Sequence, residues 1–100
     1  MPDIVGTWKL EKVKTVFYIP QEYDYSKNNI IYQFNANRAL KILSDIEYYG
    51  KQAGEYTYRT ENRTVIIGKD SPYGYQISGD ELMIDDSPLD DPNYYFIRVK

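Results

Sequence analysis

Apolar and polar residues alternate with a period of two along most of this sequence, and no segment sustains the period of an amphipathic helix. The clearest example is residues 54–59, where Tyr56 and Tyr58 alternate with the polar Thr57 and Arg59. Side chains of a strand point alternately to opposite faces, so this pattern predicts a strand with one buried face. A chain dominated by such segments is expected to be all-β.

Short runs of turn residues separate the alternating segments, and together they predict eight strands. We expect these strands at residues 7–18, 30–34, 38–44, 54–59, 63–68, 73–78, 81–85 and 94–99. In the first strand the apolar parity changes between Leu10 and Val13, which predicts a β-bulge near Glu11 and Lys12. Closure into an antiparallel up-and-down barrel would remove the exposed sheet edges, so an eight-stranded barrel is the expected fold.

The composition limits the functions that are open to the chain. Its 100 residues suit a single domain, residues 1–100, and 42% of them are apolar, which indicates a folded core. Cysteine and histidine are absent, so thiol nucleophiles, histidine-based triads and metal sites with Cys or His ligands are excluded. The sequence indicates no metal site and no cofactor. A carboxylate pair is the remaining route to an enzyme, and none is indicated, so we expect a non-catalytic protein.

Charge and hydropathy argue against two classes of partner. The net charge is −3, and no basic patch indicates nucleic acid. No stretch is apolar enough to span a membrane. The acidic run that includes Asp85, Asp86, Asp90 and Asp91 lacks the spacing and the central glycine of a calcium loop, so we expect a solvated loop. The compartment stays open: a removed leader would indicate a periplasmic or extracellular protein, and a native start at Met1 a cytoplasmic one.

The triplet from Gly6 to Trp8 opens the first expected strand, and Arg98 lies on the last. This pattern resembles the two ends of the barrels of the lipocalin (calycin) superfamily, and the chain is most similar to the small bacterial lipocalin-like domains. The resemblance implies that Trp8 plugs one end of the barrel and that Arg98 covers the indole ring as a cation–π cap. Fatty-acid-binding proteins also begin with Gly-x-Trp, but they insert two helices after the first strand. Residues 19–29 are too few for those helices, so that branch is rejected.

The last strand admits two registers. If Arg98 turns inward over Trp8, Phe96 turns inward with it. Tyr95, Ile97 and Val99 then form an outward apolar stripe, which predicts a surface for a partner protein or for self-association as a homodimer. In the other register these three residues face the core and Arg98 is solvated. The resemblance favours the first register.

The alternation turns a set of mostly aromatic side chains toward the barrel interior, and we predict that they bind ligand: Tyr32, Phe34, Tyr56, Tyr58, Tyr73, Tyr75 and Ile77. These side chains would line a pocket or fill the core, and both interpretations stay open. The resemblance favours the pocket, and it implies a carrier or sensor for a small apolar or amphipathic molecule. The expected mouth lies at two loops, residues 19–29 and 45–52, whose aromatic side chains are Tyr23, Tyr25, Tyr48 and Tyr49. The alternatives are a protein-interaction domain with a filled core and a carboxylate-based enzyme.

Overall fold

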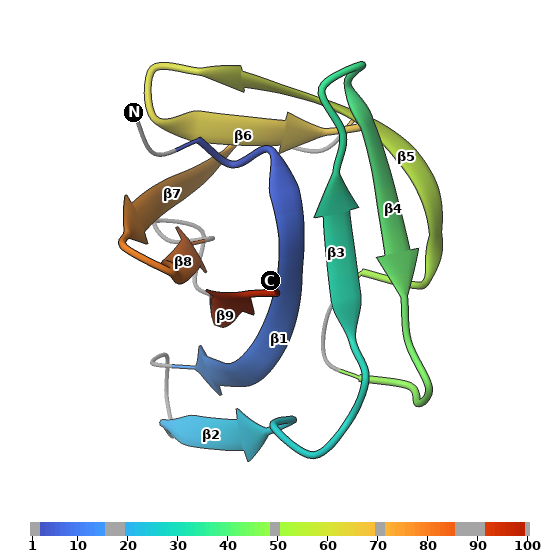
Figure 1. Ribbon diagram of the computed structural model, residues 1–100. Helices are drawn as coiled ribbons and strands as arrows, with labels where there is room; N and C mark the ends of the chain where they lie inside the picture. Colours follow the sequence, from blue (N-terminus) through green and yellow to red (C-terminus); the bar gives the residue numbers. More distant parts are fainter. Residues whose placement is uncertain (1–2, 16–19, 49–50, 70–71, 86–91, 100) are drawn as a thin grey trace.

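The computed structural model of the chain describes residues 3–15, 20–48, 51–69, 72–85 and 92–99 (Figure 1). Within these ranges the chain forms nine β-strands. They are β1 (Gly6–Thr15), β2 (Gln21–Asp24), β3 (Ile31–Phe34), β4 (Ala39–Leu43), β5 (Gly54–Glu61), β6 (Thr64–Ile67), β7 (Tyr73–Ser78), β8 (Glu81–Asp85) and β9 (Asn93–Arg98). None of the described segments is a helix that could traverse a bilayer.

The sheet closes on itself because β9 pairs with β1. Eight strands, β1 and β3–β9, form the closed ring, and every pairing in it is antiparallel. This arrangement confirms the predicted all-β fold and the eight-stranded antiparallel barrel.

One strand was not expected from the sequence. β2 lies within residues 19–29, which we predicted to be a loop, and that prediction is wrong for Gln21–Asp24. β3 pairs with β1 only over residues 6–9, so residues 12–15 of β1 keep a free edge that β2 occupies. Three of the four residues of β2 are exposed. This strand is therefore stabilised by backbone hydrogen bonds to β1 rather than by burial of one face. Because it lacks apolar alternation, its sequence does not predict a strand.

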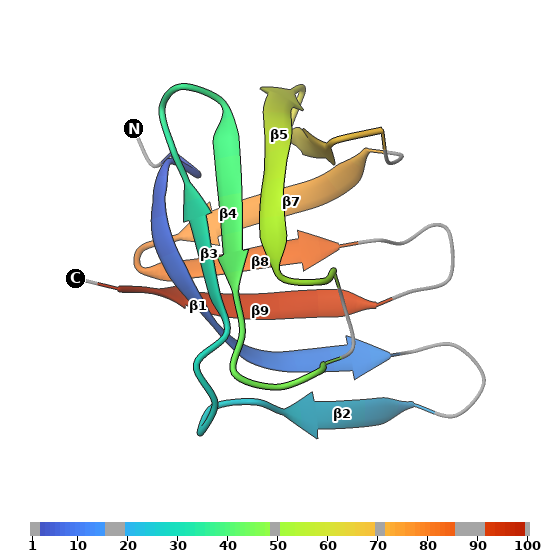
Figure 2. The same ribbon diagram turned by 90° about the vertical axis from the view of Figure 1, so that its right-hand side faces the viewer.

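β1 bends strongly along its length (Figure 1). Its register against β9 shifts between Leu10 and Lys12, which confirms the predicted β-bulge. The bend allows one strand to belong to two layers. In Figure 2 the second half of β1 runs beside β9, β8 and β7, whereas β3, β4 and β5 cross these strands steeply.

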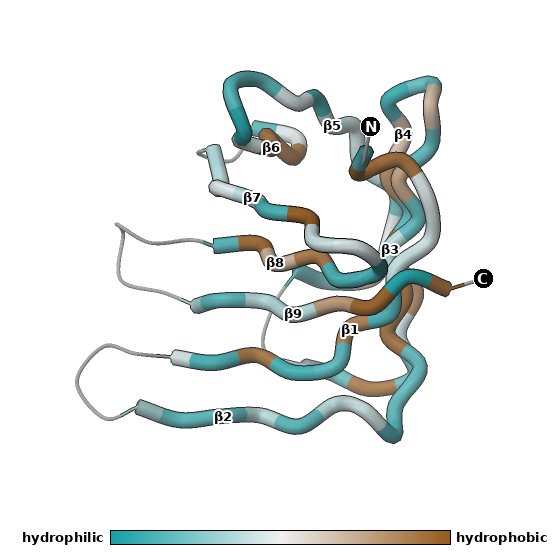
Figure 3. The backbone as a smooth tube through the Cα atoms, turned by 60° about the vertical axis from the view of Figure 1, so that its left-hand side comes forward, coloured by the Kyte–Doolittle hydropathy of each residue, from teal (hydrophilic) through white to brown (hydrophobic). Residues whose placement is uncertain are grey.

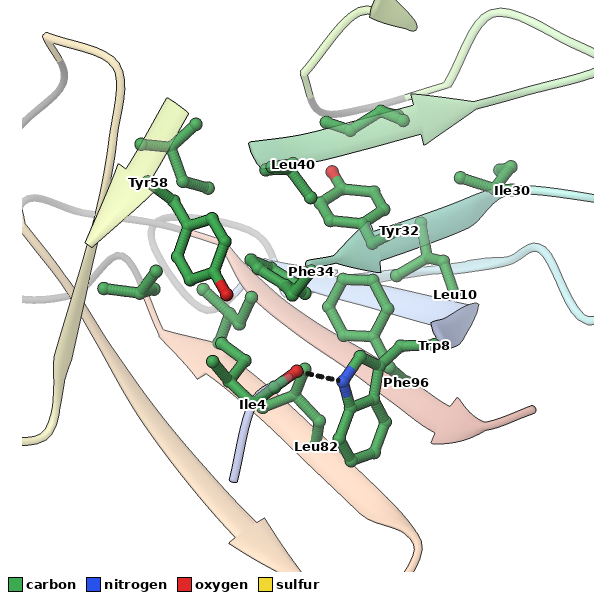
Figure 4. Close-up of a cluster of buried hydrophobic side chains, with 14 of the residues drawn as sticks. Ile4, Trp8, Leu10, Ile30, Tyr32, Phe34, Leu40, Tyr58, Leu82 and Phe96 are labelled. Carbon is green, nitrogen blue, oxygen red and sulfur yellow. Dashed lines mark hydrogen bonds between the residues drawn. The ribbon is translucent and has the colours of Figure 1, made fainter. Parts of the chain in front are cut away.

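Apolar side chains fill the space between the two layers. Hydrophobic and hydrophilic residues alternate along several strands in Figure 3, as a half-buried sheet requires. The buried side chains, many of them drawn in Figure 4, are Ile4, Trp8, Leu10, Val13, Ile30, Tyr32, Phe34, Leu40, Ile42, Tyr58, Val65, Ile67, Leu82, Ile84 and Phe96. Among the described residues no charged side chain is buried with them.

Trp8 closes one end of the barrel and has no exposed surface. Its indole Nε1–H donates a hydrogen bond to the carbonyl of Ile4 at 2.8 Å (Figure 4). The guanidinium carbon of Arg98 lies 4.1 Å from the centre of the Trp8 ring, which confirms the predicted cation–π cap. The same guanidinium donates to the carbonyls of Val5 at 3.4 Å and Asp3 at 3.2 Å. The segment before β1 is thereby held across the closed end.

The cap settles which face of β9 points inward. Phe96 is 2% exposed and lies in the core, whereas Ile97 is 39% and Val99 43% exposed. The first of the two predicted registers is therefore correct.

Gly6 is required where Arg98 crosses β1. Its φ of +142° lies in a region that side-chain-bearing residues rarely adopt. A Cβ atom at Gly6 would lie 2.5 Å from Nη1 of Arg98, so the guanidinium would have to move off the indole ring.

We predict that Gly6→Ala and Arg98→Ala are strongly coupled. In the wild type, Gly6→Ala should add backbone strain and also displace Arg98. In an Arg98→Ala background only the strain should remain. The loss of unfolding free energy caused by Gly6→Ala should therefore be about 1–2 kcal/mol larger in the wild type than in this background, as measured by urea denaturation. Gly79→Ala is the matched control, because Gly79 has a φ of +61° and open space around the added Cβ. Additive effects at Gly6 and Arg98 would contradict the cap.

Candidate functional site

Partly buried tyrosines gather at the end of the barrel away from Trp8. The partly buried apolar side chains that pack on the core are Tyr23, Tyr25, Tyr48, Tyr56, Tyr73, Tyr75, Ile77 and Tyr94. Most of them come from the strand starts and loops at this end, including β2, the 44–53 loop, the first half of β5 and the start of β9. Strand parity turns Tyr56 and Tyr94 inward, because Tyr58 and Phe96 on the same strands are buried. We call Tyr25, Tyr32, Tyr48, Tyr56 and Tyr94 the mouth tyrosines.

A phenol pair lies at the base of the mouth. Tyr32 is 4% exposed, and its hydroxyl lies 2.7 Å from the hydroxyl of Tyr48. In Figure 4 the Tyr32 hydroxyl points away from Trp8. The Tyr32 ring packs edge-on against Phe96 with 4.8 Å between ring centres, and Tyr48 packs edge-on against Tyr25 at 5.9 Å. Ring contacts and the phenol hydrogen bond together thus connect the core to Tyr48 in the 44–53 loop.

Either hydroxyl of this pair could donate by geometry, and the burial of Tyr32 favours Tyr32 as the donor. Within the described residues the Tyr32 hydroxyl has one hydrogen-bond partner, Tyr48, and Tyr32 is buried. A buried hydroxyl that did not donate would lose a hydrogen bond, so Tyr32 should donate to Tyr48. The Tyr48 hydroxyl then retains its own proton, which it can donate to a bound molecule.

The other polar groups at the mouth are oriented by loop contacts. The Tyr56 hydroxyl donates to the carbonyl of Gln52 at 2.7 Å. The ammonium of Lys51 lies over the Tyr56 ring, 5.3 Å from its centre, and places a positive charge at the rim. A hollow of about 570 Å³ lies along the 44–53 loop, and both Tyr48 and Lys51 line it.

Burial keeps the phenols of this site neutral. It raises the pKa of Tyr32 well above 10.0, and the nearby phenols of Tyr48, Tyr94 and Tyr56 raise it further. Burial also raises the pKa of Tyr48 to about 12, against an opposing effect of the hydrogen bond with Tyr32. At neutral pH these hydroxyls can donate and accept hydrogen bonds, but they do not supply a base.

The residues predicted to bind ligand divide into two groups. Tyr32 and Tyr56 lie at the mouth with Tyr48 and Tyr94, whereas Tyr58 belongs to the closed half of the barrel. The Tyr58 hydroxyl donates to the carbonyl of Asn35 at 2.7 Å. Its ring packs edge-on against Phe34 with 5.0 Å between ring centres.

The side chains of β7 keep their predicted direction. Tyr73, Tyr75 and Ile77 pack against the core and are partly buried. Burial raises the pKa of Tyr58, and Asp3 and Tyr75 add to this effect.

The loop tyrosines were identified in the sequence only as members of the expected mouth. Tyr23, Tyr25 and Tyr48 prove to be half-buried against the core, and Tyr49 lies outside the described residues. No periodic signal places Tyr48 beside Tyr32, because the two residues belong to a loop and a strand. In the described ranges there is no group of three acidic residues that could hold a metal ion.

A family model described as a lipocalin-like domain matches residues 4–98 of the chain. The match spans the barrel from Ile4, which accepts the indole hydrogen bond, to Arg98, which covers the indole ring. Neither the curated proteins nor the solved structures include a significant match.

We predict that the fold loses stability as the pH rises through the range from 10 to about 12. The folded state keeps the Tyr48 proton up to a pKa of about 12, whereas the unfolded chain releases it near 10.0. The folded state therefore binds more protons in this range, and its stability falls as the pH rises. Urea denaturation at pH 8 and pH 11 should show a smaller fall for Tyr48→Phe than for the wild type. An equal loss of stability in the two proteins would contradict a raised pKa for Tyr48.

Proposed function

The chain belongs to the lipocalin-like domain family, and we propose that it binds a small amphipathic molecule at the mouth tyrosines without changing it. The observation that carries this proposal is the Tyr32–Tyr48 phenol pair. With Tyr32 as the donor, the Tyr48 hydroxyl keeps a proton that it can donate to a ligand packed on the Tyr32 ring. Apolar walls with a few oriented polar groups are typical of small-molecule sites.

Because side chains fill the closed half of the barrel, the proposed ligand would lie near the mouth rather than deep in the interior. Phe34, Tyr58 and Phe96 occupy the closed half together with Trp8. An eight-stranded barrel has an interior just wide enough for side chains or one small ligand. The apolar part of the ligand would therefore rest above Tyr32, between Tyr25, Tyr48, Tyr56 and Tyr94. A single chain or ring system fits this position, as in a lipid.

The polar groups at the rim favour a ligand whose head group accepts hydrogen bonds. Tyr48 offers a hydroxyl proton, and the positively charged Lys51 lines the same hollow. A carboxylate head group would match both. The same chemistry supports a non-catalytic role, because the buried phenols of this site hold their protons at neutral pH and supply no general base.

Ligand binding should raise the melting temperature, and fatty acids, sterols, haem and aromatic metabolites form the first screen. For a carboxylate ligand, we expect Tyr48→Phe to weaken binding about 3-fold to 10-fold through loss of one hydrogen bond. Tyr58→Phe is the matched control, since its hydroxyl is bonded to Asn35 in the closed half, and it should leave the affinity unchanged. Trp8 fluorescence should change little.

Two outcomes would contradict the proposed site. In the first, none of the compounds stabilises the fold. In the second, Tyr48→Phe and Tyr58→Phe weaken binding equally.

A second candidate function is self-association through the outer face of β9. Ile97 and Val99 are among the exposed large apolar side chains, and Tyr95 shares their face. The ammonium groups of Lys12 and Lys14 each lie 5.3 Å from the centre of the Tyr95 ring, which orients this ring on the outer surface. A barrel with a filled core would then serve as a protein-interaction domain.

Sedimentation analysis of Ile97→Lys tests this candidate. A homodimer through Tyr95, Ile97 and Val99 should dissociate to a monomer when a charge enters the apolar contact. Leu43→Lys is the matched control, because Leu43 is 42% exposed on β4, away from the stripe. A wild type that stays monomeric at all concentrations would exclude the dimer.

A further inference from the structure

Arg38 occupies a backbone position that normally favours glycine. It ends the turn between β3 and β4, where its N–H donates to the carbonyl of Asn35 at 3.1 Å, and its φ is 70°. At comparable left-handed positions the chain uses Gly68 (φ 60°) and Gly79 (φ 61°). A side chain in this conformation strains the backbone, so the fold would be more stable with glycine at position 38. Strained residues of this kind are often found at functional sites.

Arg59 lies beside Arg38 on the outer surface of the barrel. The Tyr58 N–H donates to the carbonyl of Arg38 at 2.9 Å, which joins the start of β4 to β5. Both arginines line the same two adjoining hollows, of about 310 and 240 Å³. The lining residues of the smaller hollow are Arg38, Thr57, Tyr58, Arg59, Ile66 and Gly68, and none of them is acidic.

The positive charge of this hollow is only weakly neutralised. Within the described part of the chain, no carboxylate forms an ion pair with Arg38. Among the described residues Arg59 forms one ion pair, with Glu61 at 3.9 Å, and the two side chains are 64% and 62% exposed. Such an exposed pair contributes little stability, so the Arg59 guanidinium can bind another anion. Asp3 lines the larger hollow but forms no ion pair with either arginine in the described part of the chain.

We propose that Arg38, Arg59 and Thr57 bind the phosphoryl group of a small phosphate ester. Arginine donors match the oxygens of phosphate in a fork geometry, and two guanidinium groups with one hydroxyl can engage three oxygens of a tetrahedral anion. A carboxylate, with two oxygens, would satisfy this donor set less completely. The site lies on the outside of β4–β6, so it is separate from the mouth tyrosines and does not depend on the function proposed for them.

Arg38→Gly gives a test in which stability and binding change in opposite directions. It should raise the urea midpoint, because glycine relieves the backbone strain. In an NMR titration with inorganic phosphate and glycerol phosphate at constant ionic strength, it should weaken binding about 10-fold or more. Arg63→Gly is the matched control: Arg63 also has a left-handed backbone (φ 63°) and carries the same charge, but it lines neither hollow. This control should raise the midpoint and leave the phosphate affinity unchanged.

A second arm separates a soluble ester from a lipid head group. Wild type and Arg38→Gly are co-sedimented with phosphatidylcholine vesicles that contain phosphatidic acid. Saturable shifts at the amides of Thr57 and Gly68 with glycerol phosphate support a soluble ester. Vesicle binding that Arg38→Gly abolishes, without such shifts, supports a lipid phosphate. If neither ligand binds, or if Arg63→Gly weakens binding as much as Arg38→Gly, the proposed site is wrong.

Discussion

The stacking of Arg98 on Trp8 joins the two ends of the chain at the strand pairing that closes the barrel. Trp8 lies near the start of β1 and Arg98 at the end of β9, and these two residues are register partners in the pairing that closes the sheet. The guanidinium covers the ring and also holds the carbonyls of Asp3 and Val5. Loss of so large a buried aromatic side chain typically costs about 3–5 kcal/mol. One contact therefore links the first strand, the last strand and the segment that covers the barrel end.

This closure also limits where the proposed ligand would bind. Trp8, Phe34 and Phe96 fill the closed half, so the proposed ligand would enter at the opposite end, where the buried Tyr32 meets Tyr48. The two ends differ in chemistry as well as in access. At the closed end the charged guanidinium of Arg98 lies over the Trp8 ring, whereas the mouth carries the neutral phenols of Tyr32 and Tyr48. The residues that stabilise the closed end therefore differ from those proposed to bind ligand, and the two sets can be mutated separately.

Periodic and local signals in the sequence predicted most of the fold and the closed end. Alternation located the ring strands, the parity change in β1 located the bulge, and Gly6, Trp8 and Arg98 located the cap. β2 was missed because it buries no apolar face and forms only where β1 leaves an edge free. The mouth was predicted less completely, because the contact between Tyr32 and Tyr48 depends on the path of a loop. Likewise, the sequence pattern does not predict the left-handed backbone conformation of Arg38.

Hydrogen exchange of the Trp8 indole proton tests the central claim most directly. This proton is donated to the carbonyl of Ile4 at 2.8 Å, and the side chain that carries it has no exposed surface. If Arg98 and the segment before β1 seal the barrel end, the proton should exchange only on global unfolding, together with the slowest amides of β1 and β9. Exchange of the indole proton from the intact fold, much faster than that of these amides, would contradict the account.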